Sequence, residues 1–119
     1  MELTYTDYDD LVRKISLKGR LDVEGATAID LRFTSLACSQ QRLVIVDLTE
    51  VDFIASLGIA TLVRNAKAAR LRAGNLVLLS PQENVARVLT AMKIDQLLTV
   101  CPDMENALLR VREIPPAVT

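Results

Sequence analysis

Residues Leu43-Val44-Ile45-Val46 form an uninterrupted aliphatic run that ends at Asp47. Such a run is typical of a strand covered on both faces, so it predicts the central strand of a sheet. A second run, Asn75-Leu76-Val77-Leu78-Leu79, predicts another buried strand. Between them apolar residues recur at helical spacing from about residue 57 to residue 73, and Gly74 is expected to stop that helix in a left-handed conformation. Two strands joined by such a helix predict a right-handed, parallel βαβ unit.

The segment before this unit predicts two strands and a helix. Residues 11–17 alternate imperfectly between apolar and polar side chains, as a half-buried strand does, and residues 2–6 are expected to pair with it. Gly19-Arg20-Leu21-Asp22 then breaks the pattern, and Asp22 is placed to cap a helix. The expected apolar face of that helix comprises Ala26, Ile29, Phe33 and Leu36.

The segment after the unit predicts two more helices. Ser80-Pro81-Gln82-Glu83 resembles a helix start with Ser80 as the cap and Glu83 at the third helical position. The expected buried face of this helix comprises Val85, Val88, Leu89 and Met92. After a short apolar segment at residues 97–100, a last helix is expected to start near Asp103.

Together these elements predict a single α/β domain. We expect a small mixed, partly parallel β-sheet of about four to five strands with about four helices, spanning residues 1–119. The ordered core is expected over about residues 3–112, and residues 113–119, with Pro115-Pro116, are expected to form a C-terminal tail.

Composition excludes several classes of function. A formal net charge of -1 argues against a nucleic-acid binder, because such proteins need a concentrated excess of Lys and Arg. The absence of Trp disfavours a stacking platform for bases. The chain has no His, which removes His-dependent catalysis and the commonest metal ligand. Cys38 and Cys101 form no CxxC motif and are interpreted as reduced thiols. Asp47 and Asp52 are interpreted as turn or cap residues rather than an acidic catalytic pair. We therefore expect no enzyme, no catalytic residue and no metal site.

The sequence also bears on location. The start, Met-Glu-Leu-Thr-Tyr-Thr-Asp, has neither the basic residues nor the apolar stretch of a signal peptide, and no later apolar run is long enough to span a bilayer. These features predict a cytoplasmic protein without direct membrane insertion.

The segment Val51-Asp52-Phe53-Ile54-Ala55-Ser56-Leu57-Gly58-Ile59 stands apart, because an apolar patch runs into a serine that opens an amphipathic helix. Ser56 lies at or near the N-cap of that helix. On periodicity alone, an ordinary capping serine is the favoured interpretation, since Ser is a preferred cap residue.

Several motifs in chain order resemble the STAS domain of bacterial anti-sigma-factor antagonists over about residues 3–112. Gly19-Arg20-Leu21-Asp22 resembles the family's Gly-x-Leu-Asp, and residues 44–48 resemble its central strand. Residues 53–59 are similar to the stretch that carries the phosphorylated serine, commonly Phe-Met-Asp-Ser-Ser/Thr-Gly-Leu. Ser80-Pro81 and the apolar positions after it resemble the family's third helix.

The resemblance implies an anti-sigma-factor antagonist that binds an ATP-dependent anti-sigma or switch kinase when unphosphorylated and is released by phosphorylation of Ser56. The implied partner-binding residues are Asp22, Ile54, Ala55, Ser56, Leu57, Gly58 and Ile59. Gly58 is expected to let the chain approach the partner closely. ATP and Mg²⁺ belong to the kinase, so the chain needs no cofactor, and a cognate phosphatase is a further implied partner.

Two positions depart from the family pattern. Ala55 stands where an acidic residue often precedes the serine, and Leu57 stands where Ser or Thr often follows it. Both changes make the patch more apolar. The alternative is therefore an unphosphorylated STAS interaction module of a membrane transporter or signalling scaffold, and the sequence leaves the kinase, the sigma factor, the output and the oligomeric state open.

Overall fold

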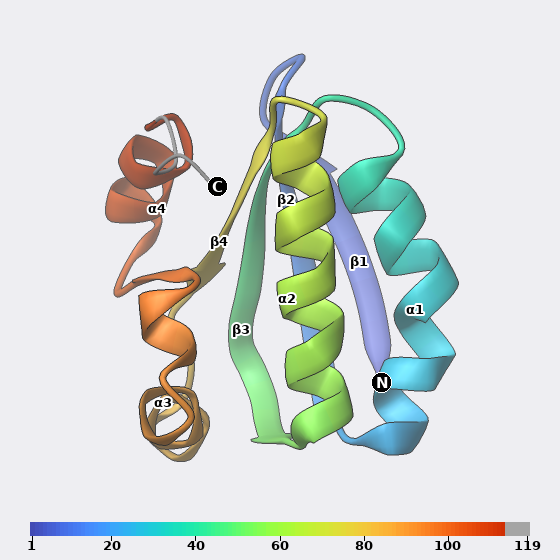
Figure 1. Ribbon diagram of the computed structural model, residues 1–119, viewed down its shortest axis with the longest axis vertical. Helices are drawn as coiled ribbons and strands as arrows, with labels where there is room; N and C mark the ends of the chain where they lie inside the picture. The colour runs from blue at the N-terminus through green and yellow to red at the C-terminus, as the bar shows by residue number, and fades with distance from the viewer. Residues whose placement is uncertain (114–119) are drawn as a thin grey trace.

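The computed structural model describes residues 1–113, which form five strands, four α-helices and one short 3-10 helix (Figure 1). The strands are β1 (Glu2–Asp7), β2 (Val12–Leu21), β3 (Leu43–Ile54), β4 (Asn75–Leu79) and β5 (Thr99–Cys101). The helices are α1 (Val23–Cys38), α2 (Ser56–Leu71), α3 (Glu83–Ala91) and α4 (Met104–Val111), with the 3-10 turn η1 at Ile94–Gln96. The expected C-terminal tail, with Pro115-Pro116, lies outside the described residues apart from Glu113.

The five strands form one sheet in the order β1-β2-β3-β4-β5. β1 pairs with β2 in antiparallel fashion, as expected for a hairpin, and all other neighbours are parallel. The predicted unit of two parallel strands joined by a helix is confirmed as β3-α2-β4. The predicted mixed α/β fold is therefore confirmed.

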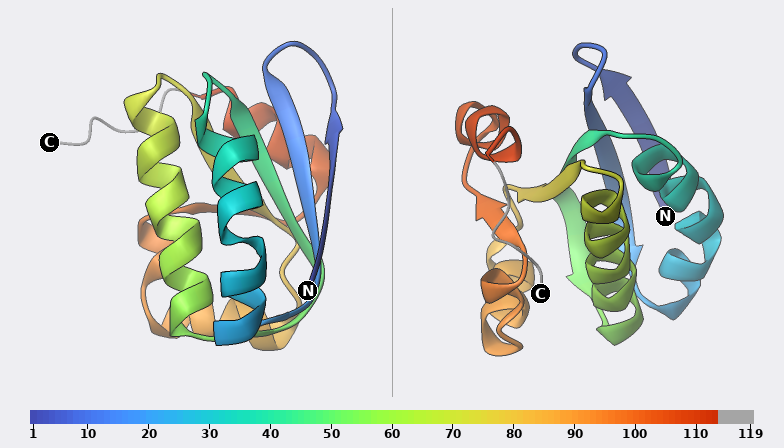
Figure 2. Two further views of the ribbon diagram at one scale, coloured as in Figure 1. Left: turned by 90° about the vertical axis from the view of Figure 1, so that its right-hand side faces the viewer. Right: turned by 45° about the horizontal axis from the view of Figure 1, so that its top comes forward.

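Helices cover the two faces of the sheet unequally (Figure 2). α1 and α2 lie side by side over one face, where the buried side chains of both helices meet those of the sheet around fully buried Phe33. α4 packs against the other face over β3, β4 and β5, through Ala107 and Val111. Because aliphatic residues of β3 alternate between these two cores, Val44, Ile45 and Val46 are all fully buried.

The face that α4 leaves uncovered on β1, β2 and β3 is polar. Two cross-strand ion pairs lie on it, between Lys14 and Asp47 at 3.7 Å and between Lys18 and Glu50 at 3.8 Å. These residues line a shallow depression of about 450 Å³. The carboxylate of Asp47 also accepts a hydrogen bond from the backbone N–H of Thr49 at 2.9 Å, so Asp47 is a strand residue with a structural contact rather than a turn residue.

Two strands are longer than their apolar patterns predict. β3 continues beyond Asp47 to Ile54, and Gly19-Arg20-Leu21, expected to lie after a strand, is the end of β2. The pairing between the two strands contains irregularities between Ser16 and Lys18 and between Gly19 and Arg20. Such irregularities obscure the alternation of side chains by which a strand is identified in sequence.

Three predicted details of the helix ends are wrong. The left-handed residue after α2 is Ala73, with φ of 61°, and not Gly74. A glycine is needed at position 74 for a different reason, because a Cβ there would collide with the backbone carbonyl oxygen of Arg42. Ser80 does not cap α3, because its hydroxyl donates to the carbonyl oxygen of Pro102 at 2.6 Å and the helix begins only at Glu83. Met92 is 49% exposed at the end of α3 rather than buried.

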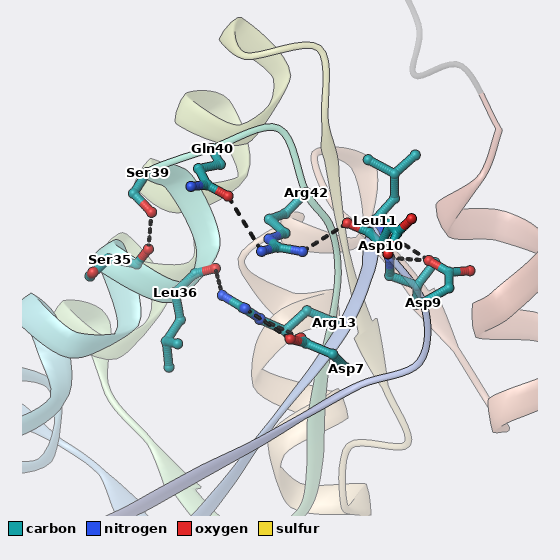
Figure 3. Close-up of polar contacts among 11 residues, drawn as sticks. Asp7, Asp9, Asp10, Leu11, Arg13, Ser35, Leu36, Ser39, Gln40 and Arg42 are labelled. Carbon is teal, nitrogen blue, oxygen red and sulfur yellow. Dashed lines mark hydrogen bonds and ion pairs between the residues drawn. The ribbon is translucent and has the colours of Figure 1, made fainter.

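A polar network fixes the end of the sheet where β2 and β3 begin (Figure 3). Arg13 donates to both carboxylate oxygens of Asp7, at 2.6 and 3.1 Å, and to the carbonyl oxygen of Leu36 in α1 at 3.0 Å. Asp9 accepts hydrogen bonds from the backbone N–H groups of Val12 and Leu11 and from Arg112, and these bonds lower the pKa of Asp9 to about 2. The network ties the β1–β2 turn to α1 and to the last turn of α4.

The two cysteines lie on opposite faces of the sheet, and both are free and buried. The thiol of Cys38 donates to the side-chain oxygen of Asn65 at 3.1 Å, between α1 and α2. Burial raises the pKa of both thiols, which favours the protonated form. Their positions agree with the prediction of unpaired thiols.

Candidate functional site

The candidate site lies at the edge of the sheet where the parallel strands end. Leu21 pairs with Ile54, and the backbone N–H of Ala55 donates to the carbonyl oxygen of Leu21 at 3.0 Å. β2 leads into α1 and β3 leads into α2 at this edge, at the bottom of Figure 1. The structure therefore brings together two motifs that are more than thirty residues apart in the sequence, with Asp22 in one and Ser56 in the other.

Ser56 is the first residue of α2 and is exposed. The N-cap is Ala55, which is extended and has no side chain able to accept a hydrogen bond. Ser56 is therefore not the capping residue that the helical pattern alone favours. Within residues 1–113 its hydroxyl has no protein hydrogen-bond partner, and the first bond of the helix runs from the N–H of Ile59 to the carbonyl oxygen of Ala55 at 3.0 Å. The N–H groups of the first turn thus have no acceptor within the helix.

Asp22 caps α1, as predicted. Its Oδ1 accepts a hydrogen bond from the backbone N–H of Gly25 at 2.9 Å, and the side chain of Arg20 lies 3.4 Å from Oδ2. The bond from Gly25, with a smaller contribution from Arg20, lowers the pKa of Asp22. The carboxylate is therefore charged and fixed in position at neutral pH.

Arg20 and Phe53 form a contact that the sequence did not reveal. They are paired across β2 and β3, and the guanidinium carbon lies 4.2 Å from the centre of the Phe53 ring. This distance places the two groups within range of a cation–π interaction. The contact depends on the register of the two strands, including the irregularity just before Arg20, which no local sequence pattern indicates.

The apolar part of the site consists of Val23, Phe53 and Leu57, which we call the edge patch. Their exposed fractions are 61%, 37% and 39% respectively. Phe53 lies near the end of β3, Leu57 follows Ser56 in α2, and Val23 is the first residue of α1, next to Asp22. Large apolar side chains that are exposed near one end of a sheet are typical of a protein-binding surface.

Ile54 and Ile59, which were expected to flank the serine on an exposed surface, are buried. Each is only 4% exposed and belongs to the core beneath α1 and α2. Ala55 is half-buried. The exposed apolar contribution to the site therefore comes from Leu57 and from Val23 and Phe53, two residues that were not among the expected partner-binding residues.

Gly58 is also buried, and its close approach is internal. A Cβ at this position would lie 2.5 Å from the carbonyl oxygen of Leu21 and 2.6 Å from its Cγ. The first turn of α2 packs directly on the end of β2 only because residue 58 has no side chain. This contact, rather than proximity to a partner, accounts for the glycine.

A shallow depression of about 160 Å³ continues from the edge patch between α1 and α2. It is lined by Ala26, Thr27, Asp30, Leu57, Thr61 and Arg64. Arg64 forms an ion pair with Asp30 across the two helices. The depression gives the site a concave surface beside Ser56.

Two further features concern metals and membranes. Residues 1–113 contain no cluster of three or more His, Cys, Asp or Glu side chains that could hold a metal ion. Within the same part of the chain, every helix is too short or too polar to cross a bilayer.

Comparison with known proteins places this architecture in a family. The sequence profile of the STAS domain matches residues 6–107. An anti-sigma-factor antagonist (STAS) domain protein from Planctomyces limnophilus is 26% identical, with a TM-score of 0.78 over 92% of this chain and 96% of that one. The anti-sigma factor antagonist SpoIIAA in its unphosphorylated form is 20% identical, with a TM-score of 0.76 over 93% of this chain and 96% of that one.

Two other solved structures share the fold. The Bacillus cell fate determinant SpoIIAA in its phosphorylated form is 19% identical, with a TM-score of 0.64 over 93% of this chain and all of that one. The murine Solute Carrier 26 family member A9 anion transporter is 15% identical, with a TM-score of 0.72 over 85% of this chain and 18% of that one. Since the STAS profile covers most of the sequence and the topology agrees, the chain belongs to the STAS domain family.

Proposed function

We propose that this chain is an anti-sigma-factor antagonist that works as a reversible protein-binding switch. In its unphosphorylated form it binds an ATP-dependent anti-sigma factor or switch kinase, and phosphorylation of Ser56 by that kinase releases it. The observation that carries the proposal is the exposed hydroxyl of Ser56, which opens α2 beside the edge patch and has no hydrogen-bond partner within residues 1–113. A hydroxyl placed in this way is accessible to a kinase.

The position of Ser56 explains how the fold would tolerate the modification. A phosphate at the start of a helix meets free backbone N–H groups and the positive end of the helix dipole. Ser56 is exposed, so the added group displaces no core side chain. The modified domain should therefore remain folded.

The same position explains how the modification would end binding. A phosphate adds about -1.5 to -2 charges and retains tightly bound water, so it is strongly disfavoured inside a packed apolar interface. Leu57 lies next to Ser56 and both are exposed, so a partner that binds Leu57 would bring its surface beside the serine. Binding would then be lost without unfolding.

The partner would contact Asp22, Ala55, Ser56 and Leu57 directly, and Ile54, Gly58 and Ile59 would support that surface from within the core. In this scheme the chain binds and is modified rather than catalysing a reaction, and ATP and Mg²⁺ arrive with the kinase. The proposal places the chain in the cytoplasm, with a phosphatase to restore the unmodified form. Solved structures of SpoIIAA in unphosphorylated and phosphorylated forms support the idea that this fold accommodates both states.

The test is mass spectrometry of the chain isolated from its own cells, together with its co-purifying proteins. We expect one phosphate on the peptide that contains Ser56, no phosphate in a Ser56→Ala variant, and an ATP-binding protein enriched on the unmodified form. A phosphate on another residue would overturn the site assignment. If Ser56 is unmodified in every growth and stress condition and a transporter or scaffold always co-purifies, the chain is a constitutive interaction module and not a switch.

A further inference from the structure

Four segments surround the ends of the parallel strands, namely residues 20–24, 52–58, 80–84 and 101–104. Arg20 is the single Lys or Arg in these four segments. The acidic residues in the same segments are Asp22, Glu24, Asp52, Glu83 and Asp103. A phosphate on Ser56 would thus enter a surface that is already negative, with Arg20 as its nearest cation along these segments.

The guanidinium of Arg20 is only loosely engaged in the unmodified chain. It lies over the ring of Phe53, and its Nε is 3.4 Å from the carboxylate of Asp22, a long hydrogen bond. Its side chain is 60% exposed. Within residues 1–113 neither of its terminal amino groups has a hydrogen-bond acceptor, so both are available to a new anion.

The end of β2 that carries Arg20 lies beside the end of β3 that leads into Ser56. Arg20 pairs with Phe53, three residues before Ser56, and the next residue of β2, Leu21, accepts the hydrogen bond from Ala55. The contact with Phe53 already directs the guanidinium toward β3, the strand that leads into Ser56.

We propose that Arg20 is the internal counter-ion of a phosphate on Ser56. In the unmodified chain it rests on Phe53 and Asp22, and in the modified chain its terminal amino groups bind the phosphate. The phosphate carries more charge than a carboxylate and fits the planar donors of a guanidinium, so it competes effectively with Asp22. This proposal rests on the proposed function, because it concerns the modified state of the same residue.

The movement would change the edge of the sheet in two further ways. Departure of Arg20 uncovers the ring of Phe53 and leaves Asp22 with its bond to the N–H of Gly25 alone. Phosphorylation would then alter two residues of the candidate site besides Ser56 itself.

The test uses the full chain with phosphoserine incorporated at position 56 during translation, so that it needs no kinase. The second pKa of the phosphate is measured by phosphorus NMR in the wild type, in Arg20→Gln and in Lys18→Gln. Lys18 is the matched control, because it lies on the same strand, is similarly exposed and pairs with Glu50 on the polar face. We expect the pKa in Arg20→Gln to be higher than in the wild type by about half a unit to one unit, and the control to match the wild type.

Equal phosphate pKa values in the wild type and Arg20→Gln, with both proteins folded by circular dichroism, would show that the helix terminus alone holds the phosphate and would overturn the proposal. An equal rise in Arg20→Gln and Lys18→Gln would do the same, because it would reflect net charge rather than contact. If Ser56 proves unmodified in cells, the proposed function fails. The pairing of Arg20 with the incorporated phosphoserine is still tested, because that phosphate does not come from a kinase.

Discussion

A Leu57→Asp variant should bind the anti-sigma partner at least about 30-fold more weakly than the wild type, a loss of about 2 kcal/mol. Leu57 is 39% exposed, follows Ser56 in the chain and lines the depression between α1 and α2. A carboxylate there would have to lose its hydration inside an apolar contact. The fold should remain intact, because an acidic residue in the first turn of a helix interacts favourably with the helix dipole.

Leu71→Asp is the matched control for this variant. Leu71 ends the same helix and is 89% exposed, but it lies at the opposite end from Ser56. Titration calorimetry with the kinase that co-purifies with the chain should give the wild-type affinity for Leu71→Asp. Equal affinities for both variants would place the partner elsewhere on the molecule.

A Gly58→Ala variant should be less stable than the wild type by about 2–3 kcal/mol, because the new Cβ would overlap the backbone oxygen and the side chain of Leu21. The first turn of α2 would have to move away from β2, and the intrinsic preference of Ala for helices would offset only part of this cost. Urea unfolding followed by circular dichroism measures the change.

Ser56→Ala is the control for Gly58→Ala, since it changes an exposed side chain in the same helical turn and should alter stability by no more than about 0.5 kcal/mol. If Gly58→Ala unfolds at the wild-type urea concentration but binds the partner poorly, the glycine serves the interface and not the packing. That result would contradict the internal role described above.

The order of elements and the parallel β3-α2-β4 unit could be predicted from the sequence, because aliphatic runs and helical spacing reflect burial directly. The end of β3 could not. Thr49 and Glu50 are polar and exposed, yet they continue the strand, because Glu50 pairs with Lys18 of β2 and the backbone oxygen of Thr49 accepts a hydrogen bond from the side chain of Gln82. These partners are far away in the sequence and leave no local pattern.

The candidate site was predictable only where its residues act locally. Asp22 could be identified as a cap, because capping is a short-range interaction within one segment. The burial of Ile54 and Ile59, the internal contact of Gly58 and the stacking of Arg20 on Phe53 all depend on the register between β2 and β3. Ser80, with φ of 47°, shows the same limit, since its local pattern predicts a cap while its hydroxyl binds the segment after β5.

The most direct test of the switch is to measure the affinity of the co-purifying kinase for the unmodified chain and for the chain with phosphoserine at position 56, side by side in one buffer. Binding of the phosphorylated chain at least about 100-fold weaker than that of the unmodified chain, a difference of about 2.7 kcal/mol, is the predicted result. Equal dissociation constants for two folded proteins would contradict control of binding by Ser56.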